Sequence, residues 1–431
     1  LASVTSTSDF VALAHPQFPA HQVRVKKSDF CDSTVNVYTG YLDVDYGAKH
    51  MFFYFFESRR DPDNDDVMMW INGGPGCSSS LGCSWSSYRH EKRVEQWTTW
   101  NPYSWNSETN IFFLTSREVN VGFSYAEFGE TIETTEDAAK NVHAFLTIFF
   151  ETFSQFKGRP LHLAGESYGG RYLPSFGSYV YDQNQIAIQA GRDTLNLTSI
   201  LIGNGVVDYT KIYRGRHEME CATAALPVPF QSISVCVQQK TALTRCEKAM
   251  QASCVEVHDE INCRAALSFC QEVVSGTYAH SGRNVYDISK DCIGDLCYAE
   301  SGAITDYLNQ PSVRSLLGVE SPGNFTSCNG ELGSAFSGRL DRTTMSQNYI
   351  AALLDRGVRV LIYSGTYDWQ CNWVASRLWL EEMEWGGAER YRANAFRDWA
   401  VDGRTVGEVK TSGLLTFATI YGAGHMMSAS F

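Results

Sequence analysis

The 431-residue sequence contains no apolar run that approaches the ~18 residues of a membrane-spanning helix. Its first five residues, Leu-Ala-Ser-Val-Thr, lack the charged and apolar regions of a signal peptide. Basic residues are in deficit, because 35 Lys and Arg stand against 48 Asp and Glu, for a formal net charge of −13. Such a chain repels nucleic acids and anionic membranes, so we expect neither as a partner. The sequence predicts a soluble, already processed protein.

Most of the thirteen cysteines lack the spacing of a metal or redox motif. Disulfides are the better interpretation, and they imply an oxidising, secretory route. The sequons Asn196-Leu-Thr and Asn324-Phe-Thr agree with that route as N-glycosylation sites. We expect no metal and no cofactor. Ten cysteines lie outside any Cys-x-x-Cys pair or His-rich zinc spacing: Cys77, Cys221, Cys236, Cys246, Cys254, Cys263, Cys270, Cys292, Cys297 and Cys328.

With 44% hydrophobic and 13% aromatic residues, the chain can bury a sizeable core. Short apolar runs alternate with segments of helical spacing, which predicts an α/β fold whose central sheet is mostly parallel and flanked by helices. From 206 to 328 the periodicity fades, nine cysteines gather and short loops are expected, so we predict an inserted, disulfide-stapled cap between core segments 1–205 and 329–431. Strands are expected at 35–44, 50–56, 67–71, 111–114, 199–202, 358–363 and 414–421, the first two as a hairpin, and helices at 134–153, 345–356 and 373–385.

The stretch around Ser167 carries the first chemical signal. Gly165-Glu-Ser-Tyr-Gly169 follows the apolar run that ends at Ala164 and precedes a plausible helix, so Ser167 is expected on a sharp strand-to-helix turn. Glycine suits both flanking positions, since a bulkier side chain there would collide with neighbouring backbone or block the substrate. Ser167 is therefore the candidate nucleophile of an α/β hydrolase.

An α/β hydrolase places its acid and then its histidine after Ser167, each on a loop that follows a strand. Asp368 follows the predicted strand 358–363, and His425 follows the predicted strand 414–421. The other three histidines beyond Ser167 precede Asp368 and belong to the cap, which leaves His425 as the base. His162, within the strand before Ser167, and His143, within a helix, are interpreted as packed or hydrogen-bonded residues without a role in catalysis.

Several blocks together resemble the signature motifs of the serine carboxypeptidases. The resemblance runs from about Cys31 to His425, in order and with sensible spacing, and it implies peptide C-termini as the substrate class. The blocks are Trp70-Ile-Asn-Gly-Gly-Pro-Gly-Cys-Ser-Ser, Asn101-Pro-Tyr-Ser-Trp-Asn, Gly122-Phe-Ser-Tyr, Gly165-Glu-Ser-Tyr-Gly-Gly-Arg-Tyr, Ile202-Gly-Asn-Gly, Asp368-Trp-Gln-Cys-Asn and Gly424-His-Met.

The resemblance and the chemistry together assign roles. Ser167 attacks the scissile carbonyl, His425 moves the proton and Asp368 orients the imidazole, through an acyl-enzyme. The amides of Gly74 and Tyr168 are expected to form the oxyanion hole. By resemblance, the substrate carboxylate is bound by Trp70, Asn72, Gly73 and Glu166.

Glu166 can bind a carboxylate only while it is protonated, so we expect activity at acid pH. The family usually adds a second Glu in a Glu-x-Gly-Pro block, and residues 83–89 contain no such block.

The resemblance also implies a disulfide pattern. Cys371 is left alone by parity and is expected beside the substrate pocket, together with Met426. A helix start could lower the pKa of this thiol, whereas burial would raise it. The implied bridges are Cys77–Cys328, Cys221–Cys236, Cys246–Cys270, Cys254–Cys263, Cys292–Cys297 and, least firmly, Cys31–Cys83.

Two alternatives remain open on the sequence. Serine carboxypeptidase-like acyltransferases share these blocks and transfer the acyl group to an alcohol. A protective or scaffold protein could keep the fold without catalysis. The sequence does not distinguish a secreted from a vacuolar or lysosome-like destination, and it gives neither the oligomeric state nor the preferred substrate side chains.

Overall fold

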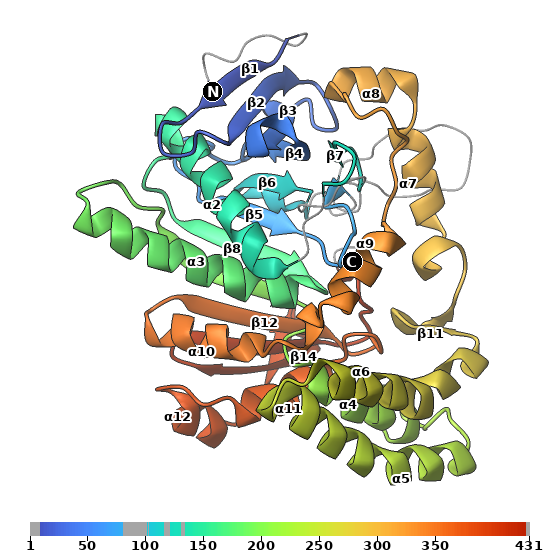
Figure 1. The fold of residues 1–431 in the computed structure, drawn as a ribbon. Coiled ribbons are helices and arrows are strands. Elements are labelled where there is room, and N and C mark those ends of the chain that lie inside the picture. The colour runs from blue at the N-terminus through green and yellow to red at the C-terminus, as the bar shows by residue number, and fades with distance from the viewer. Residues whose placement is uncertain (1–8, 81–100, 102, 116–120, 131–133, 428–431) are drawn as a thin grey trace. The chain divides into compact units, whose positions relative to one another are not determined.

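A computed structural model describes residues 9–80, 101, 103–115, 121–130 and 134–427. The chain divides into two compact units. Unit 1 comprises residues 1–165, 175–200 and 299–336, and unit 2 comprises residues 166–174, 201–298 and 337–431. Figure 1 traces the chain from blue at the N-terminus to red at the C-terminus. The predicted core and cap segments follow different boundaries and stay a prediction.

Unit 1 is built on strands in the order β1-β2-β3-β4-β6-β5-β8-β9, with β7 beside β4. The pairs β3/β4 and β4/β6 are antiparallel, whereas β5 is parallel to both β6 and β8. The predicted hairpin is confirmed by β3 and β4. The bounds are β1 Val11–Ala14, β2 Gln22–Ser28, β3 Val37–Val44, β4 Lys49–Phe56, β5 Val67–Ile71, β6 Asn110–Leu114, β7 Tyr125–Ala126, β8 Leu161–Glu166 and β9 Leu197–Gly203.

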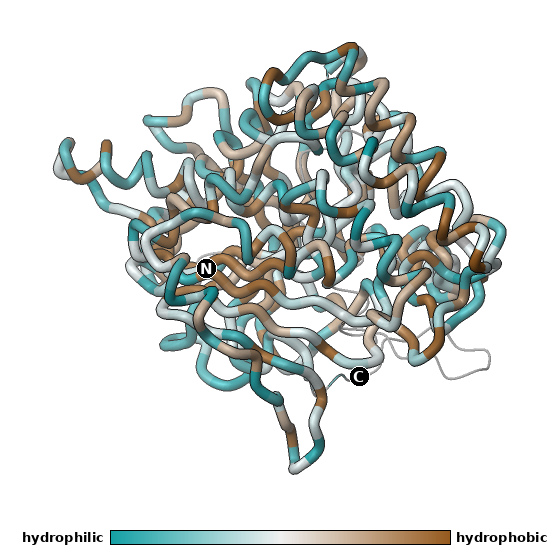
Figure 2. Tube along the Cα trace, turned by 90° about the horizontal axis from the view of Figure 1, so that it is seen from below, coloured by the Kyte–Doolittle hydropathy of each residue, from teal (hydrophilic) through white to brown (hydrophobic). Residues whose placement is uncertain are grey.

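Aromatic side chains fill the core of unit 1. Phe53 and Phe55 of β4 pack on the rings of Phe145 and Phe149 from α2. Helix α2 (Thr135–Thr152) begins where the Thr134 side chain accepts a hydrogen bond from the Asp137 amide, and it packs on β1 and β2. Figure 2 shows hydrophobic residues concentrated along strands beside the N-terminus, whereas projecting segments mix hydrophilic and hydrophobic residues. Further α-helices among the described residues of this unit are α3 (Gly169–Gln189), which begins in unit 2, α7 (Glu300–Leu308), α8 (Pro311–Leu317) and α9 (Gly330–Gly338), which ends in unit 2.

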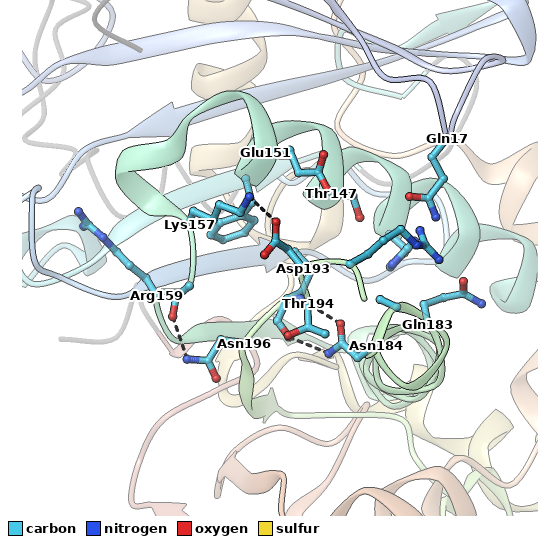
Figure 3. A pocket seen from close by; sticks show the side chains of 16 residues that line it. Gln17, Thr147, Glu151, Lys157, Arg159, Gln183, Asn184, Asp193, Thr194 and Asn196 are labelled. Carbon is cyan, nitrogen blue, oxygen red and sulfur yellow. Dashed lines mark hydrogen bonds and ion pairs between the residues drawn. The ribbon is translucent and has the colours of Figure 1, made fainter. Parts of the chain in front are cut away.

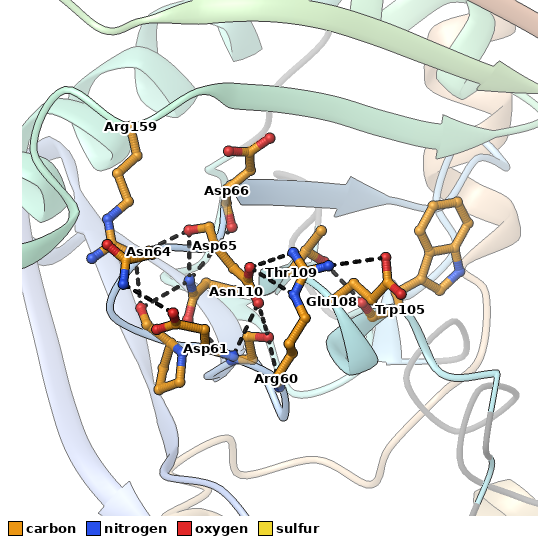
Figure 4. Close-up of polar contacts among 12 residues, drawn as sticks. Arg60, Asp61, Asn64, Asp65, Asp66, Trp105, Glu108, Thr109, Asn110 and Arg159 are labelled. Carbon is orange, nitrogen blue, oxygen red and sulfur yellow. Dashed lines mark hydrogen bonds and ion pairs between the residues drawn. The ribbon is translucent and has the colours of Figure 1, made fainter.

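A polar cluster holds the loop before β5 in unit 1 (Figure 4). Asp65 accepts hydrogen bonds from Arg60 Nε at 3.0 Å, from Ser58 Oγ at 2.5 Å and from the Asp61 amide at 3.2 Å. The Asn110 side chain donates to the Asp65 carbonyl at 3.0 Å. Every partner of this carboxylate is local, so the cluster fixes the turn that leads into β5.

Unit 2 carries strands in the order β12-β15-β14-β13, of which β12 and β15 are parallel. Helices α10 and α11 pack against β12, and α12 packs against β14. The predicted elements at 345–356, 358–363, 373–385 and 414–421 are confirmed within a few residues. The bounds are α10 Ser346–Asp355, β12 Arg359–Gly365, α11 Trp373–Glu382, α12 Ala388–Ala393, β13 Arg397–Val401, β14 Arg404–Ser412 and β15 Leu415–Ile420.

The cysteine-rich segment of unit 2 is helical, so the expectation of short loops is wrong. Helices α4 (Tyr209–Cys221), α5 (Ile233–Met250) and α6 (Glu260–Cys270) pack in succession, and the short strands β10 (Arg283–Asn284) and β11 (Asp287–Asp291) follow. Cysteines occupy buried positions where larger apolar residues would mark a helix, which is why the periodicity is faint. No helix in the described ranges is long and apolar enough to cross a membrane.

Five of the six implied disulfides are confirmed. Cys77–Cys328 lies in unit 1, and the other four lie in unit 2: Cys221–Cys236, Cys246–Cys270, Cys254–Cys263 and Cys292–Cys297. Cys83 is outside the described residues, so its pairing with Cys31 stays a prediction. The confirmed bridges place the folding of this chain in an oxidising compartment of the secretory pathway.

Candidate active site

Ser167 lies on the turn between β8 and α3, as predicted. Its φ of +62° is in the left-handed region, which a residue with a side chain occupies at a cost. Three backbone hydrogen bonds hold the turn: the Ser167 amide donates to the Gly203 carbonyl at 3.0 Å, and its carbonyl accepts from the amides of Gly170 at 3.0 Å and Val206 at 2.9 Å. A side chain at Gly165 would meet the Ile71 carbonyl at 2.4 Å, so glycine is needed before the turn.

His425 and Asp368 are in direct contact inside unit 2. Asp368 follows β12, His425 follows β15, and His425 Nδ1 donates to Asp368 Oδ2 at 2.7 Å. The second carboxylate oxygen accepts from the Cys371 amide at 3.1 Å. Asp368 is 0% exposed and His425 is 3% exposed. Because a carboxylate only accepts, it holds the proton on Nδ1 and leaves Nε2 as the basic nitrogen.

Cys371 connects Ser167 to this pair. Its sulfur, an Asp368 oxygen and a His425 ring nitrogen all lie within 4.8 Å of one another, and the Ser167 hydroxyl hydrogen-bonds the Cys371 side chain. Cys371 is a free, buried cysteine, as parity predicts. Burial and the nearby Asp368 raise the pKa of its thiol well above the ordinary value. Burial therefore outweighs the helix dipole, and the inert interpretation of this thiol is favoured.

The buried groups of the site have shifted pKa values. Burial acts to lower the pKa of His425, but the charge and hydrogen bond of Asp368, together with the charge of Glu166, raise it above its ordinary value. Burial raises the pKa of Glu166 to about 7, against an opposing contribution from His425. Each group therefore contributes to the pKa shift of the other.

Asn204 is a residue of the site to which the sequence reasoning assigned no role, although Ile202-Gly-Asn-Gly was among the blocks that resemble the serine carboxypeptidases. Its side-chain nitrogen donates to the carbonyls of Gly424 at 3.0 Å and His425 at 2.5 Å. Its side-chain oxygen accepts from the Gly365 amide at 2.9 Å. Asn204 thus ties the His425 loop to the end of β12. A polar residue with φ +41° between glycines at a strand end was the available signal.

Two tyrosines from the cysteine-rich segment also hold the His425 loop. The His425 amide donates to the Tyr286 carbonyl at 2.7 Å, and the two rings lie 5.1 Å apart. The Met426 amide donates to the Tyr298 hydroxyl oxygen at 3.3 Å. Met426, predicted to line the substrate pocket, is therefore anchored through its backbone.

The Gly-rich loop lies in unit 1 and is held by its own contacts. Trp70 Nε1 donates to Asn72 Oδ1 at 2.8 Å, and the Cys77 amide donates to the Gly73 carbonyl at 3.1 Å. Gly74 has φ +123°, which a residue with a side chain rarely adopts.

Tyr168 and Glu166 belong to unit 2, where the Tyr168 hydroxyl donates to Asp341 at 2.7 Å. The predicted oxyanion and carboxylate sets each draw on both units, so they stay predictions.

The other histidines examined have local roles. His162 bonds Ser199 at 2.7 Å and Asp66 at 2.9 Å. His143 packs edge-on against Phe18, and burial lowers its pKa to about 4.

A separate pocket lies in unit 1 near the ends of α2 and α3 (Figure 3). Lys157 and Asp193 form an ion pair at 2.5 Å there, and Asn196 donates to the Gly158 carbonyl at 3.0 Å. These polar groups engage one another, so we assign the pocket no catalytic role. Asn196 and Asn324 are both exposed, and their glycosylation stays a prediction.

Comparisons with known proteins bear on this site. The profile of the family described as Serine carboxypeptidase matches residues 29–430. "Carboxypeptidase Y homolog A" of Talaromyces stipitatus is 38% identical over 418 residues, covering 95% of this chain and 73% of that protein. "Carboxypeptidase Y" of Komagataella phaffii is 37% identical over 415 residues, covering 95% of this chain and 77% of that protein.

A solved structure agrees in fold. The crystal structure of Kex1(delta)p, a prohormone-processing carboxypeptidase from Saccharomyces cerevisiae, matches with a TM-score of 0.76 at 21% identity, covering 93% of this chain and 89% of that one. The likeness confirms the predicted α/β-hydrolase fold.

Proposed function

This chain belongs to the serine carboxypeptidase family, and we propose that Ser167, His425 and Asp368 perform its hydrolysis of peptide C-termini. The observation that carries the assignment is the buried 2.7 Å hydrogen bond between His425 and Asp368, in a cluster that Ser167 joins through Cys371. The enzyme is a hydrolase, and its substrates are peptides.

In the proposed reaction, Ser167 Oγ attacks the carbonyl carbon of the last peptide bond while His425 Nε2 takes the hydroxyl proton. The imidazolium then gives that proton to the leaving amino group, and the C-terminal amino acid departs. Water, deprotonated by His425, attacks the acyl-enzyme, and the imidazolium returns the proton to Ser167 Oγ as its ester bond breaks and the shortened peptide leaves. Asp368 stabilises the imidazolium without taking its proton. The amides of Gly74 and Tyr168 are the proposed oxyanion donors, on the strength of their motifs.

Glu166 is proposed to bind the substrate carboxylate with Trp70, Asn72 and the Gly73 amide. Its pKa of about 7 supports this role, because the neutral carboxyl can donate a hydrogen bond at acid pH. Once ionised, it would repel the substrate by about 5 kcal/mol for charges ~3 Å apart at an effective dielectric of 20.

The neutral form of Glu166 also removes one charge that raises the pKa of His425. The neutral form of Glu166 therefore favours carboxylate binding, and it leaves His425 with a lower pKa than the ionised form does, so the imidazole stays unprotonated to a lower pH.

The destination of the protein is proposed to be an acidic compartment or space, either vacuolar or extracellular. Five disulfides and an acid-favouring carboxylate site support this proposal. Protein C-termini are included among the proposed substrates.

The test is labelling with a fluorophosphonate, followed by mapping of the modified residue. We expect one equivalent on Ser167 and parallel loss of peptide hydrolysis. Labelling of another residue, or full hydrolysis after complete labelling of Ser167, would refute the assignment. Adding an acceptor alcohol separates hydrolysis from acyl transfer, because a transferase gives mainly the ester product.

A further inference from the structure

Trp369, the residue after Asp368, is held on three sides within unit 2. The Tyr278 ring stacks on its indole with centroids 4.1 Å apart, and the Arg216 guanidinium carbon lies 4.2 Å from the ring centroid. Two groups this close to one flat ring must occupy opposite faces. At the ring edge, Trp369 Nε1 donates to Glu220 Oε1 at 2.9 Å. We call Arg216, Glu220 and Tyr278 the indole clamp.

The clamp is itself fixed by further hydrogen bonds. Glu220 Oε2 accepts from Gln231 at 2.8 Å and from Gln239 at 3.1 Å. Arg216 donates to Ser275 Oγ at 2.8 Å and to Gln370 Oε1 at 3.0 Å. It therefore contacts the 368–371 loop at Gln370 as well as at Trp369.

Arg216 and Glu220 are four residues apart on α4, and they are 2% and 0% exposed. Burying two charged side chains rarely adds stability over burying apolar ones, because desolvation offsets the attraction to neighbouring groups. We therefore look for the role of Arg216 and Glu220 in the way they hold the Trp369 indole, and not in stability.

We propose that the indole clamp is a positioning device for Asp368, through which helix α4 of the cysteine-rich segment fixes the acid of the catalytic triad. This inference rests on the proposed function of Asp368. The clamp residues act on Asp368 through Trp369 and Gln370, so they are positioning residues.

Asp368 needs a fixed direction because both of its oxygens are used. One accepts from His425 and the other from the Cys371 amide. A small rotation of the 368–371 loop would lengthen the bond to His425, and misplacement by about 1 Å can cost about 100-fold in rate. Since Trp369 shares a peptide bond with Asp368, an indole that cannot slide or tilt transmits its position directly to the carboxylate.

The test is Trp369→Phe, which keeps an aromatic ring for stacking and removes the N–H donor. We expect kcat for peptide hydrolysis to fall about 10-fold while KM stays within about twofold. The matched control is Trp373→Phe, because Trp373 also donates an indole N–H, to the Ala224 carbonyl at 3.1 Å, and lies outside the clamp. That variant is expected to keep kcat within about twofold.

A double variant separates positioning from simple packing. In an Asp368→Ala background there is no carboxylate to position, so Trp369→Phe should cost less than about twofold further in kcat. The proposal is overturned if Trp369→Phe leaves kcat unchanged, or if it costs the same 10-fold without Asp368. Tyr278→Leu is the second variant, because it uncovers one face of the indole and keeps its N–H bond. We expect it to lower kcat about threefold when Asp368 is present and to have no such effect in the Asp368→Ala background.

The underlying assignment is checked separately by Asp368→Ala alone. A loss of about 10⁴ in kcat supports the triad. If this variant retained most of the activity, the proposed function would fail whatever the clamp variants did.

Discussion

Two carboxyl groups of equal exposure behave in opposite ways. Asp65 in unit 1 and Glu166 in unit 2 are each 5% exposed. Burial acts to raise the pKa of Asp65, but hydrogen bonds from Arg60, Ser58 and the Asp61 amide lower it below its ordinary value. Around Glu166 the described residues supply no hydrogen-bond donor to the carboxylate, so burial prevails and raises its pKa to about 7. Glu166 combines burial with a lack of donors among the described residues, and this combination leaves its carboxyl neutral and available for a ligand.

Two histidines repeat this lesson. His143 is buried against aromatic rings, no carboxylate of the described part of the chain bonds it, and burial lowers its pKa to about 4. His425 is more deeply buried, yet its bond to Asp368 reverses the direction of the shift. A buried histidine with a carboxylate on one nitrogen can serve as a base, whereas one enclosed by rings is a packing residue.

The largest expected effect comes from removing the nucleophile. Ser167→Ala should lower kcat for peptide hydrolysis by about 10⁶, because the triad acts as a unit. A discontinuous assay of peptide hydrolysis, with a reaction that contains no enzyme as the blank, would measure the residual rate. Retention of more than a few per cent of wild-type activity would show that Ser167 is not the nucleophile.

Ser364→Ala is the matched control for this variant. Ser364 lies fully buried in β12, and its hydroxyl oxygen has no hydrogen-bond partner among the residues that the structure describes. Its removal should leave kcat within about twofold.

The second prediction tests the difference between the carboxyl groups of Glu166 and Asp65. Above pH 7, KM of the wild-type enzyme for peptides with a free carboxylate should rise about tenfold per pH unit, as Glu166 ionises. Glu166→Gln should flatten this rise, since an amide donates a hydrogen bond and does not ionise. Steady-state kinetics from pH 6 to 9 provide the measurement. Equal slopes in the two proteins would exclude Glu166 as the group that binds the carboxylate.

Asp65→Asn is the matched control for Glu166→Gln. It removes a carboxylate of the same exposure that is held by local donors. Its KM should follow the wild-type pH dependence, even where the protein is less stable.

The sequence predicted those site residues that belong to a motif required by the chemistry. Ser167, Asp368 and His425 each follow a strand in the order that an α/β hydrolase requires, and the structure puts His425 and Asp368 in contact. The burial of Cys371 and the pKa of Glu166 depend on surroundings from several loops, which no local pattern specifies. The same holds for Asn204, whose partners lie more than 150 residues away.

The sequence predicted helices and strands correctly where hydrophobic periodicity is strong, as in α2 and β5. This periodicity is hidden in α4 to α6, where buried cysteines and polar residues such as Gln239 replace large apolar side chains. The hairpin of β13 and β14 was also missed, because β13 is exposed along its length and has no alternating pattern.

The third prediction concerns stability. The pKa of Glu166 is raised from 4.5 to about 7 in the folded state, so its contribution is fully present below pH 4.5 and is lost as pH rises through 7. Relative to Glu166→Gln, the wild-type protein should lose about 3 kcal/mol of unfolding free energy between pH 4 and pH 8. Chemical denaturation of both proteins at each pH measures this difference. A constant difference across this range would mean that Glu166 does not titrate in it.

The smallest expected effect belongs to Cys371. Its raised thiol pKa predicts slow alkylation by iodoacetamide at pH 7. An organomercurial adduct should nevertheless block peptide hydrolysis, because the sulfur lies beside His425 and Asp368. Cys371→Ser should keep kcat/KM within about tenfold and abolish the mercurial effect. A stoichiometric adduct on Cys371 with full activity would contradict its placement beside the pocket.

The most direct test compares two peptides that differ only in a free or an amidated C-terminus, across pH 4 to 9. The ratio of their kcat/KM values isolates recognition of the terminal carboxylate, because the triad chemistry is common to both. We predict a ratio that favours the free acid below pH 7 and collapses above it, as Glu166 ionises. A ratio that does not change with pH would contradict the account.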